Sequence, residues 1–296
     1  MSEAEEDHVR VIQFLSEAEV WYGSTQAEGM AWVRHYNMSD GTYAGPNYGS
    51  FTSGIVSHVS EADTELQLIK FGRPAEDKKD VVMMNFPAHA TLTQSSTILS
   101  ADFPAPAREY IETNTDTLVA YFIAAGGDQV PNSRVASEVF STDYRVYGQE
   151  LGRIAVEVMQ DMTKLESTGF GYAHRTYTGK YNKEKLDQVD KAKAVQLIWQ
   201  QVGRSSTQGA AAAKEHGFSS VYEVSAVLSR ANAPETNNME IKTLAIGDVG
   251  FIFAPYEMFG SNGQQIKEGS PFETTFVITY ANGRFGYIAS DETWDY

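Results

Sequence analysis

Cysteine is absent from all 296 residues of the chain. A chain without cysteine has no disulfides, no thiolate nucleophile and no thiolate ligand for a metal. The absence indicates no particular compartment, because it suits reducing and oxidising surroundings alike.

Long apolar runs are also absent, since none approaches the ~20 residues that a membrane-spanning helix needs. The first residues, Met1–Arg10, are acidic and lack the basic and then apolar order of a signal peptide. We therefore expect no transmembrane segment in this sequence, while its compartment stays open.

Basic residues are too few to balance the acidic ones: 23 Lys and Arg stand against 39 Asp and Glu, which gives a net charge of −16. No block of Lys or Arg reverses this balance locally. Because phosphate backbones and anionic lipids repel an acidic surface, we expect no nucleic-acid partner. With 42% hydrophobic and 21% charged residues, the composition is typical of a globular protein.

Three common catalytic motifs are missing: H-E-x-x-H, the phosphate-binding G-x-x-x-x-G-K-[ST] and the nucleophile turn G-x-S-x-G. Gly169-Phe-Gly171 begins a dinucleotide-binding pattern, but His174 stands where that pattern has its third glycine. We interpret this segment as a β-strand.

The hydrophobic pattern predicts alternating strands and helices. Leu66–Phe71 alternates as a strand does, and Val81–Phe86 is a nearly continuous apolar run, typical of a strand buried on both faces. Pro104 suits the first turn of a helix that Ser100 or Asp102 can cap. Further strands are expected at 18–23, 31–36, 117–124, 169–178, 241–246, 249–253, 274–280 and 285–289, and helices at 104–113, 143–164, 183–202, 210–216, 220–230 and 257–267. This order predicts a single α/β domain over residues 1–296, with helices packed on a mixed β-sheet.

Polar residues at strand ends are the candidates for chemistry. His89 follows the run Val81–Phe86 where the chain must turn, and α/β sheets place their sites at strand ends. Gly126-Gly127-Asp128 ends another buried strand, and its backbone N–H groups can approach a developing oxyanion. Both features also have an ordinary interpretation: His89 as a hydrogen-bonded loop histidine, and Gly126-Gly127-Asp128 as a tight turn. Glu257 and Tyr287 are likewise explained by a helix start and by core packing.

Short blocks between residues 18 and 296 recur in one family in the same order. They are Arg34-His-Tyr-Asn37, Asn85-Phe-Pro-Ala-His89-Ala-Thr91, Ser100-Ala-Asp102-Phe-Pro104, Ala125-Gly126-Gly127-Asp128-Gln-Val-Pro131-Asn132, Ala245-Ile-Gly-Asp248 through Pro255-Tyr-Glu257-Met-Phe259, and Ala281-Asn-Gly283 through Gly286-Tyr287-Ile288. In this order and spacing the sequence resembles the neutral/alkaline non-lysosomal ceramidases and their bacterial relatives.

The resemblance implies an α/β catalytic domain that hydrolyses an N-acyl sphingosine or a related small, lipid-like amide at one zinc ion. It implies zinc ligands at His89, Glu257 and Tyr287, where Tyr287 is a ligand or an oxyanion partner. It also implies a glycine turn lined by Asp128 and Asn132, which we expect to be catalytic. Zinc suits this chemistry because it lowers the pKa of bound water towards ~7 and polarises a carbonyl group. A tyrosine oxygen is an unusual zinc ligand beside histidine, cysteine and carboxylates.

The sequence departs from the family pattern in three places. The family's zinc has a further histidine in an H-x-H-[ST]-G block, which we expect upstream of Met1. The family has a serine in the glycine turn, and Gly126 stands at the aligned position. The chain stops at Trp294-Asp-Tyr296, where a further helix and a terminal domain are expected. These departures predict a catalytic-domain fragment, truncated at both ends.

Two functions of different classes therefore stay open. One is a zinc-dependent amide hydrolase, and the other is a non-catalytic binding or scaffold relative that has lost the serine and part of the metal site. A third, an α/β hydrolase without metal, needs a nucleophile beside a base. No Ser–His pair has a recognisable spacing, although such pairs form in space and sequence order can hide them.

Overall fold

Strands between Glu19 and Lys164 form a five-stranded mixed sheet. The computed structural model describes residues 17–45, 53–73, 78–94 and 96–290, so the predicted features at Met1–Arg10 and Trp294–Tyr296 lie outside the described residues. The strands, in spatial order, are β10 (Thr163–Lys164), β1 (Glu19–Gln26), β6 (Glu65–Gly72), β7 (Asp80–Phe86) and β8 (Thr117–Ile123). All neighbours are antiparallel except β7 and β8, which run parallel. Parallel neighbours end at the same edge of the sheet, and this edge positions the candidate site.

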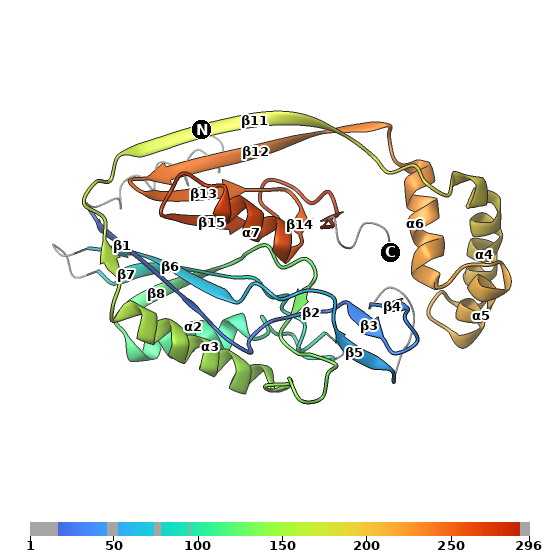
Figure 1. Ribbon diagram of the computed structural model, residues 1–296, viewed down its shortest axis with the longest axis horizontal. Coiled ribbons are helices and arrows are strands. Elements are labelled where there is room, and N and C mark those ends of the chain that lie inside the picture. Colours follow the sequence, from blue (N-terminus) through green and yellow to red (C-terminus); the bar gives the residue numbers. More distant parts are fainter. Residues whose placement is uncertain (1–16, 46–52, 74–77, 95, 291–296) are drawn as a thin grey trace.

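Helices α2 (Pro104–Asn114) and α3 (Tyr144–Met159) cover one face of this sheet (Figure 1). Helix α2 connects β7 to β8, and Pro104 and Pro106 fit its first turn because that turn has no internal N–H partners to lose. The predicted cap is wrong: the N-cap residue is Phe103, and the Asp102 carboxylate accepts hydrogen bonds from the Phe103 and Thr93 N–H groups instead.

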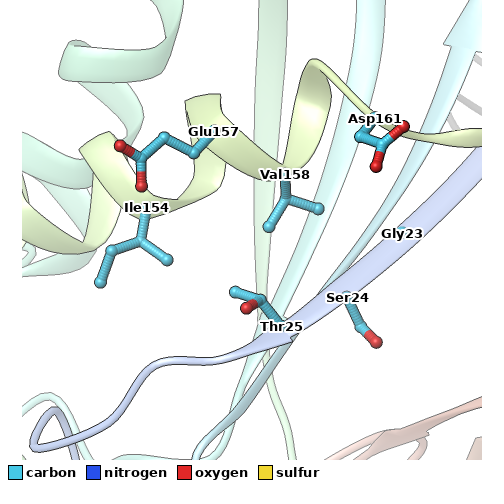
Figure 2. Close-up of a pocket in the computed structure, with 7 residues that line it drawn as sticks. All are labelled: Gly23, Ser24, Thr25, Ile154, Glu157, Val158 and Asp161. Atoms are coloured by element: carbon cyan, nitrogen blue, oxygen red, sulfur yellow. The ribbon is translucent and has the colours of Figure 1, made fainter.

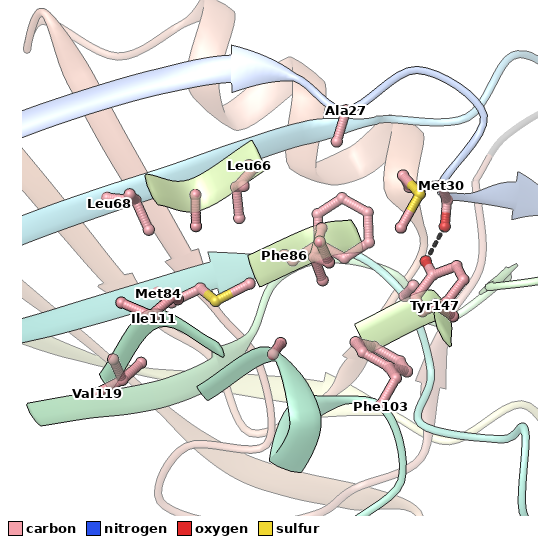
Figure 3. Packing of buried hydrophobic residues seen from close by; sticks show 14 of the residues in the cluster. Ala27, Met30, Leu66, Leu68, Met84, Phe86, Phe103, Ile111, Val119 and Tyr147 are labelled. Carbon is pink, nitrogen blue, oxygen red and sulfur yellow. Dashed lines mark hydrogen bonds between the residues drawn. The ribbon is translucent and has the colours of Figure 1, made fainter. Parts of the chain in front are cut away.

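The core between these helices and the sheet is apolar and fully buried (Figure 3). Its large members are Leu66, Leu68, Met84, Phe86, Phe103, Ile111, Tyr147 and Leu151. The rings of Phe103 and Tyr147 meet edge to face with centroids 5.0 Å apart, a favoured aromatic geometry. The Tyr147 hydroxyl donates to the Met30 carbonyl oxygen, which satisfies its one buried polar group.

A second sheet packs on the opposite face of the first. Its order is β11 (Phe170–Lys180), β12 (Thr236–Ile246), β13 (Val249–Phe253) and β15 (Thr274–Ile278), with only β13 and β15 parallel. Val20 and Ile69 of the first sheet meet Val249, Phe251 and Phe276 of the second. The predicted combination of a mixed β-sheet with packed helices is confirmed. The structure has two large sheets that pack on each other, whereas the sequence predicted one.

The long hairpin of β11 and β12 carries a helical unit at its end (Figure 1). The unit comprises η1 (Leu186–Gln188), α4 (Val189–Val202), α5 (Thr207–Glu215) and α6 (Val221–Asn232). It has its own buried core, made of Ala192, Val195, Ala212, Ala213, Phe218, Val224, Val227 and Leu228. Ser206 and Ser220 cap α5 and α6 by accepting hydrogen bonds from the backbone N–H groups of Gly209 and Glu223.

Three small sheets and one further helix complete the described part of the fold. Strand β2 (Trp32–Val33) pairs with β9 (Gln129–Val130), and β3 (Tyr36–Met38) lies between β4 (Tyr43–Ala44) and β5 (Ile55–His58). Strand β14 (Glu257–Met258) pairs in parallel with β16 (Tyr287–Ile288), and α7 (Gly260–Glu268) follows β14. Among the described residues, none of the helices is both long and apolar enough to cross a bilayer.

Several predicted boundaries are wrong for local reasons. The helix expected at 143–164 ends at Met159, because the chain turns there into β10. The strand expected at 31–36 is divided into β2 and β3, which pair in different sheets, so the chain bends at Arg34 and His35. Glu257 does not begin a helix: it lies in β14, and α7 starts at Gly260.

Candidate functional site

The parallel ends of β7 and β8 bring His89 to the glycine turn. The segment with His89 follows β7 and the glycine turn follows β8, so both leave the sheet at the same edge. The His89 backbone N–H donates to the Gln129 carbonyl oxygen at 3.0 Å. The His89 side chain is mostly buried, and its Nε2 lies 3.1 Å from the Gly127 carbonyl oxygen. Because a carbonyl oxygen only accepts, Nε2 carries the proton in this contact and Nδ1 of the neutral ring keeps its lone pair.

Strand β14 lies directly on the glycine turn. The Gly127 N–H donates to the Met258 carbonyl oxygen at 2.7 Å. A Cβ atom at Gly127 would lie 2.6 Å from the Glu257 carbonyl oxygen, so only glycine allows this approach. The turn thereby fixes the position of Glu257, a residue 130 positions further along the chain.

Glu257 and Tyr287 face each other across the β14–β16 pair, where they are register partners. Glu257 is almost fully buried, and its Oε2 lies 3.8 Å from His89 Nε2. Tyr287 is half-exposed and its hydroxyl donates to the Glu257 carboxylate. The three predicted metal ligands therefore lie together, although they come from three separate parts of the sequence.

The protonation states at this site follow from burial and charge. Burial and the nearby Arg34 guanidinium lower the pKa of His89, so the ring is neutral near pH 7. Burial alone would raise the pKa of Glu257, but hydrogen bonds from Tyr280, Tyr287 and Arg284 outweigh it and keep the carboxylate ionised. Burial and the Glu257 contact raise the pKa of Tyr287, which keeps its proton.

Arg34, Tyr280 and Arg284 were not predicted as site residues. Arg34 Nη2 donates to the Gly127 carbonyl oxygen at 2.9 Å and lies 3.4 Å from the Tyr287 hydroxyl. Arg284 contacts Glu257 Oε1 through Nε and Nη2, at 3.3 and 3.2 Å. Arg34 falls in the block Arg34-His-Tyr-Asn37 and Arg284 follows the turn Asn282-Gly283, so their neighbourhoods were visible in the sequence. Tyr280 follows β15 and had no signal of its own.

The two predicted catalytic residues are Asp128, in the glycine turn, and Asn132, shortly after it. Asp128 is buried, and its Oδ1 accepts a hydrogen bond from the Gly260 N–H at 2.7 Å, at the start of α7. Asn132 follows β9, and in the described part of the chain its side chain makes no hydrogen bond with His89, Glu257 or Tyr287. Asp128 thus has a clear role in holding α7, and a catalytic role for either residue stays a prediction.

Gly126 leaves no room for the family's serine. A Cβ atom there would lie 2.5 Å from both the carbonyl carbon and oxygen of Pro87. Such a distance forces backbone movement, so no side chain fits at this position. Position 126 therefore cannot supply a side-chain nucleophile.

His35 lies beside the site and was also missed as a candidate. Its ring packs between those of Tyr43 and Phe259, with centroids 5.6 and 5.5 Å away, and the Phe259 ring in turn meets that of Tyr287. Its Nδ1 is buried and has no hydrogen-bond partner among the described residues. Burial and Arg34 lower the pKa of His35 to about 4.

A Ser–His pair that sequence spacing could not reveal lies elsewhere. Ser133 Oγ is 2.9 Å from His58 Nε2, but Glu138 Oε2 contacts the same Nε2 at 2.7 Å, and Nδ1 contacts the Val33 carbonyl oxygen. In serine hydrolase triads the carboxylate instead holds the nitrogen that does not face the serine. The arrangement does not match a triad, and it clamps the loop that follows β9.

Two surface cavities are lined by residues other than the three predicted ligands. One of about 290 Å³ lies between β1 and α3 and is lined by Gly23, Ser24, Thr25, Ile154, Glu157, Val158 and Asp161 (Figure 2). Another of about 430 Å³ lies at the start of α2, where Ala88 and Ala90 contribute to its wall. Neither is lined by His89, Glu257 or Tyr287.

Comparison with known proteins identifies the fold. No protein-family model matches the chain, and no curated protein matches its sequence. The crystal structure of neutral ceramidase from Pseudomonas aeruginosa superposes with a TM-score of 0.56 at 15% identity, over 97% of this chain and 49% of that one. A ceramidase complexed with C2 superposes with a TM-score of 0.57 at 14% identity, over 96% of this chain and 50% of that one. The chain thus has a ceramidase-like fold and spans about half the length of these structures.

Proposed function

We propose that this chain carries the metal site of a ceramidase-like amide hydrolase, with His89, Glu257 and Tyr287 as protein ligands of one zinc ion. The observation that supports the proposal is the convergence of these three residues at one sheet edge of a ceramidase-like fold, where Glu257 lies beside the His89 ring and is the register partner of Tyr287. Its substrate class would be a small or lipid-like amide.

The donor groups fit zinc, although they form only part of a shell. His89 is neutral with a lone pair on Nδ1, and Glu257 is ionised, which are the forms that bind a metal. His89 Nε2 donates to a backbone carbonyl oxygen, the usual way in which a ligating histidine is oriented. Within the described ranges, His, Cys, Asp and Glu form no group of three or more able to hold a metal. A further histidine from outside these ranges would complete the shell.

The chain's own residues would then divide the remaining tasks. When bound, zinc supplies the Lewis acidity that activates an amide carbonyl towards water. Tyr280 and Tyr287 orient the Glu257 carboxylate through their hydroxyl groups. Arg34 holds the Gly127 carbonyl oxygen and places positive charge beside Tyr287, where negative charge on a reacting oxygen would be stabilised.

Elemental analysis tests the proposal directly. Protein dialysed against zinc and then washed is expected to retain about one equivalent, and His89→Ala and Glu257→Gln are expected to lose it. His174→Ala is the matched control, because His174 is exposed and pairs with Glu240 on the β11–β12 hairpin. Hydrolysis of a fluorogenic N-acyl amide should fall in parallel with zinc content. Equal zinc in the unaltered protein and in His89→Ala would refute the proposal.

The non-catalytic alternative is favoured by one contact. Arg284 already occupies Oε1 of Glu257, so a guanidinium group stands where a metal ion would compete for the carboxylate. A protein that binds acyl amides but holds no zinc and hydrolyses none would be a binding relative, and the same measurements distinguish the two functions.

A further inference from the structure

Two guanidinium groups lie at the candidate site although the chain as a whole is acidic. Arg34 Nη2 lies 3.4 Å from the Tyr287 hydroxyl, and Arg284 Nη2 lies 3.2 Å from Glu257 Oε1. The Asp128 carboxylate, in the glycine turn, accepts a hydrogen bond from the Gly260 N–H. In a chain of net charge −16, a guanidinium group that faces solvent is a place where an anionic group can bind.

Arg284 has one nitrogen without a hydrogen-bond partner in the described part of the chain. Its Nε and Nη2 both contact a single oxygen of Glu257, whose carboxylate also accepts hydrogen bonds from Tyr280 and Tyr287. Its Nη1 has no hydrogen-bond partner among the described residues, and its side chain is 74% exposed. The guanidinium is therefore held in place on one side and open on the other.

Two partly exposed aromatic rings belong to the same chain segment as Arg284. Phe285 is 39% exposed and Tyr287 is 48% exposed. The Phe285 ring also packs at 6.0 Å from that of Tyr256, which anchors it. A ligand bound here would meet a fixed cation and apolar ring faces together.

We propose that Arg284 is a specificity-determining residue that binds a carboxylate carried by the amine half of the substrate, as in an N-acyl amino acid. The inference rests on the proposed amide hydrolase function and names its substrate class. A guanidinium binds a carboxylate through charge-assisted, planar hydrogen bonds, whereas a neutral head group offers it no charged partner. The acyl chain would lie against Phe285 and Tyr287.

The test compares ligands that differ in one charge. N-octanoylglycine and its methyl ester are titrated calorimetrically into chelator-treated protein, so that binding is measured without turnover. The unaltered protein is expected to bind the carboxylate about tenfold more tightly than the ester, as a charge-assisted contact predicts. Arg284→Gln should abolish this preference, Arg284→Lys should keep part of it, and Arg145→Gln, the same change at an exposed arginine of α3, should leave it unaltered.

The ratio of the two affinities separates specificity from general damage to the site. Loss of affinity for both ligands by the same factor in Arg284→Gln would overturn the proposal, as would an unaltered protein without preference. Hydrolysis of both amides by zinc-loaded protein, with no preference in binding or rate, would leave the hydrolase standing and refute the role of Arg284. A carboxylate preference that depends on Arg284 in a protein with no hydrolysis would support the subsite and refute the enzyme.

Discussion

At the scale of single residues, His35 couples the site's surroundings to pH. Its ring lies between two aromatic rings and its Nδ1 has no partner in the described part of the chain, so protonation would bury an uncompensated charge. With a folded-state pKa of about 4 and an ordinary unfolded value of 6.5, the unfolded state binds more protons between these limits. The contribution of His35 to stability is complete above pH 6.5 and is lost as the pH falls towards 4.

We predict that replacing His35 removes part of the protein's acid sensitivity. From the linkage relation, His35 accounts for about 2 kcal/mol of the fall in unfolding free energy between pH 7 and pH 5. His35→Phe keeps an aromatic ring and should reduce this fall by that amount, as measured by urea unfolding at both pH values. An identical fall in His35→Phe and the unaltered protein would contradict the prediction.

Single residues were predicted where a local pattern marks a strand end. His89 follows an apolar run, and the structure places it at a strand end beside the glycine turn. Arg34 and Arg284 could not be assigned in this way, because both reach the site only through tertiary contacts. A charged side chain near a turn is ordinary in sequence, and only the partner across space gives it a role.

At the scale of elements, the close packing of β14 on the glycine turn determines where Glu257 lies. The sequence favours a helix start there, since a carboxylate before a polar stretch suits a helix N-terminus. Instead, pairing with β16 and the hydrogen bond from the Gly127 N–H to the Met258 carbonyl oxygen hold Glu257 in a short strand. Long, strongly patterned elements such as β7, β8 and α2 were predictable, whereas a two-residue strand held by distant partners was not.

We predict that adding one methyl group to the turn disrupts this packing. In Gly127→Ala the new Cβ would lie 2.6 Å from the Glu257 carbonyl oxygen and 2.9 Å from its carbon. Overpacking of this kind costs about 1–3 kcal/mol of unfolding free energy, and here it would also displace Glu257. Chemical denaturation should show the loss, and zinc retention should fall with it.

A glycine with space around it provides the control for that substitution. Gly171 on β11 has the Ala245 Cβ at 3.5 Å as its contact, so Gly171→Ala should be neutral or slightly stabilising. Equal stability of Gly127→Ala and Gly171→Ala would show that β14 can move away from the turn at little cost, and that the turn does not fix Glu257.

At the scale of the whole molecule, the helical unit at the end of the β11–β12 hairpin is packed as a separate body. Its core draws only on residues of the segment from α4 to α6, and the core between the two large sheets contains none of them. The site residues lie on the sheet edge and on β14 and β16, away from this core. We infer that the sheets, with α2, α3 and α7, fold and hold the site without the unit.

Deleting the helical unit tests that independence. The Tyr181 N–H donates to the Glu235 carbonyl oxygen and Lys180 pairs with Thr236, so Asn-Gly can replace residues 182–234 as a two-residue hairpin turn. The shortened chain is expected to unfold in one cooperative transition, with a smaller denaturant slope because it exposes less surface, and with unchanged zinc retention.

Val224→Ala in the full chain should speed amide hydrogen exchange in α4–α6 and leave β6–β8 unaffected, because a cavity in one core weakens the elements that share it. A shortened chain that fails to fold, or faster exchange in the sheets, would mean that the two bodies form one cooperative unit.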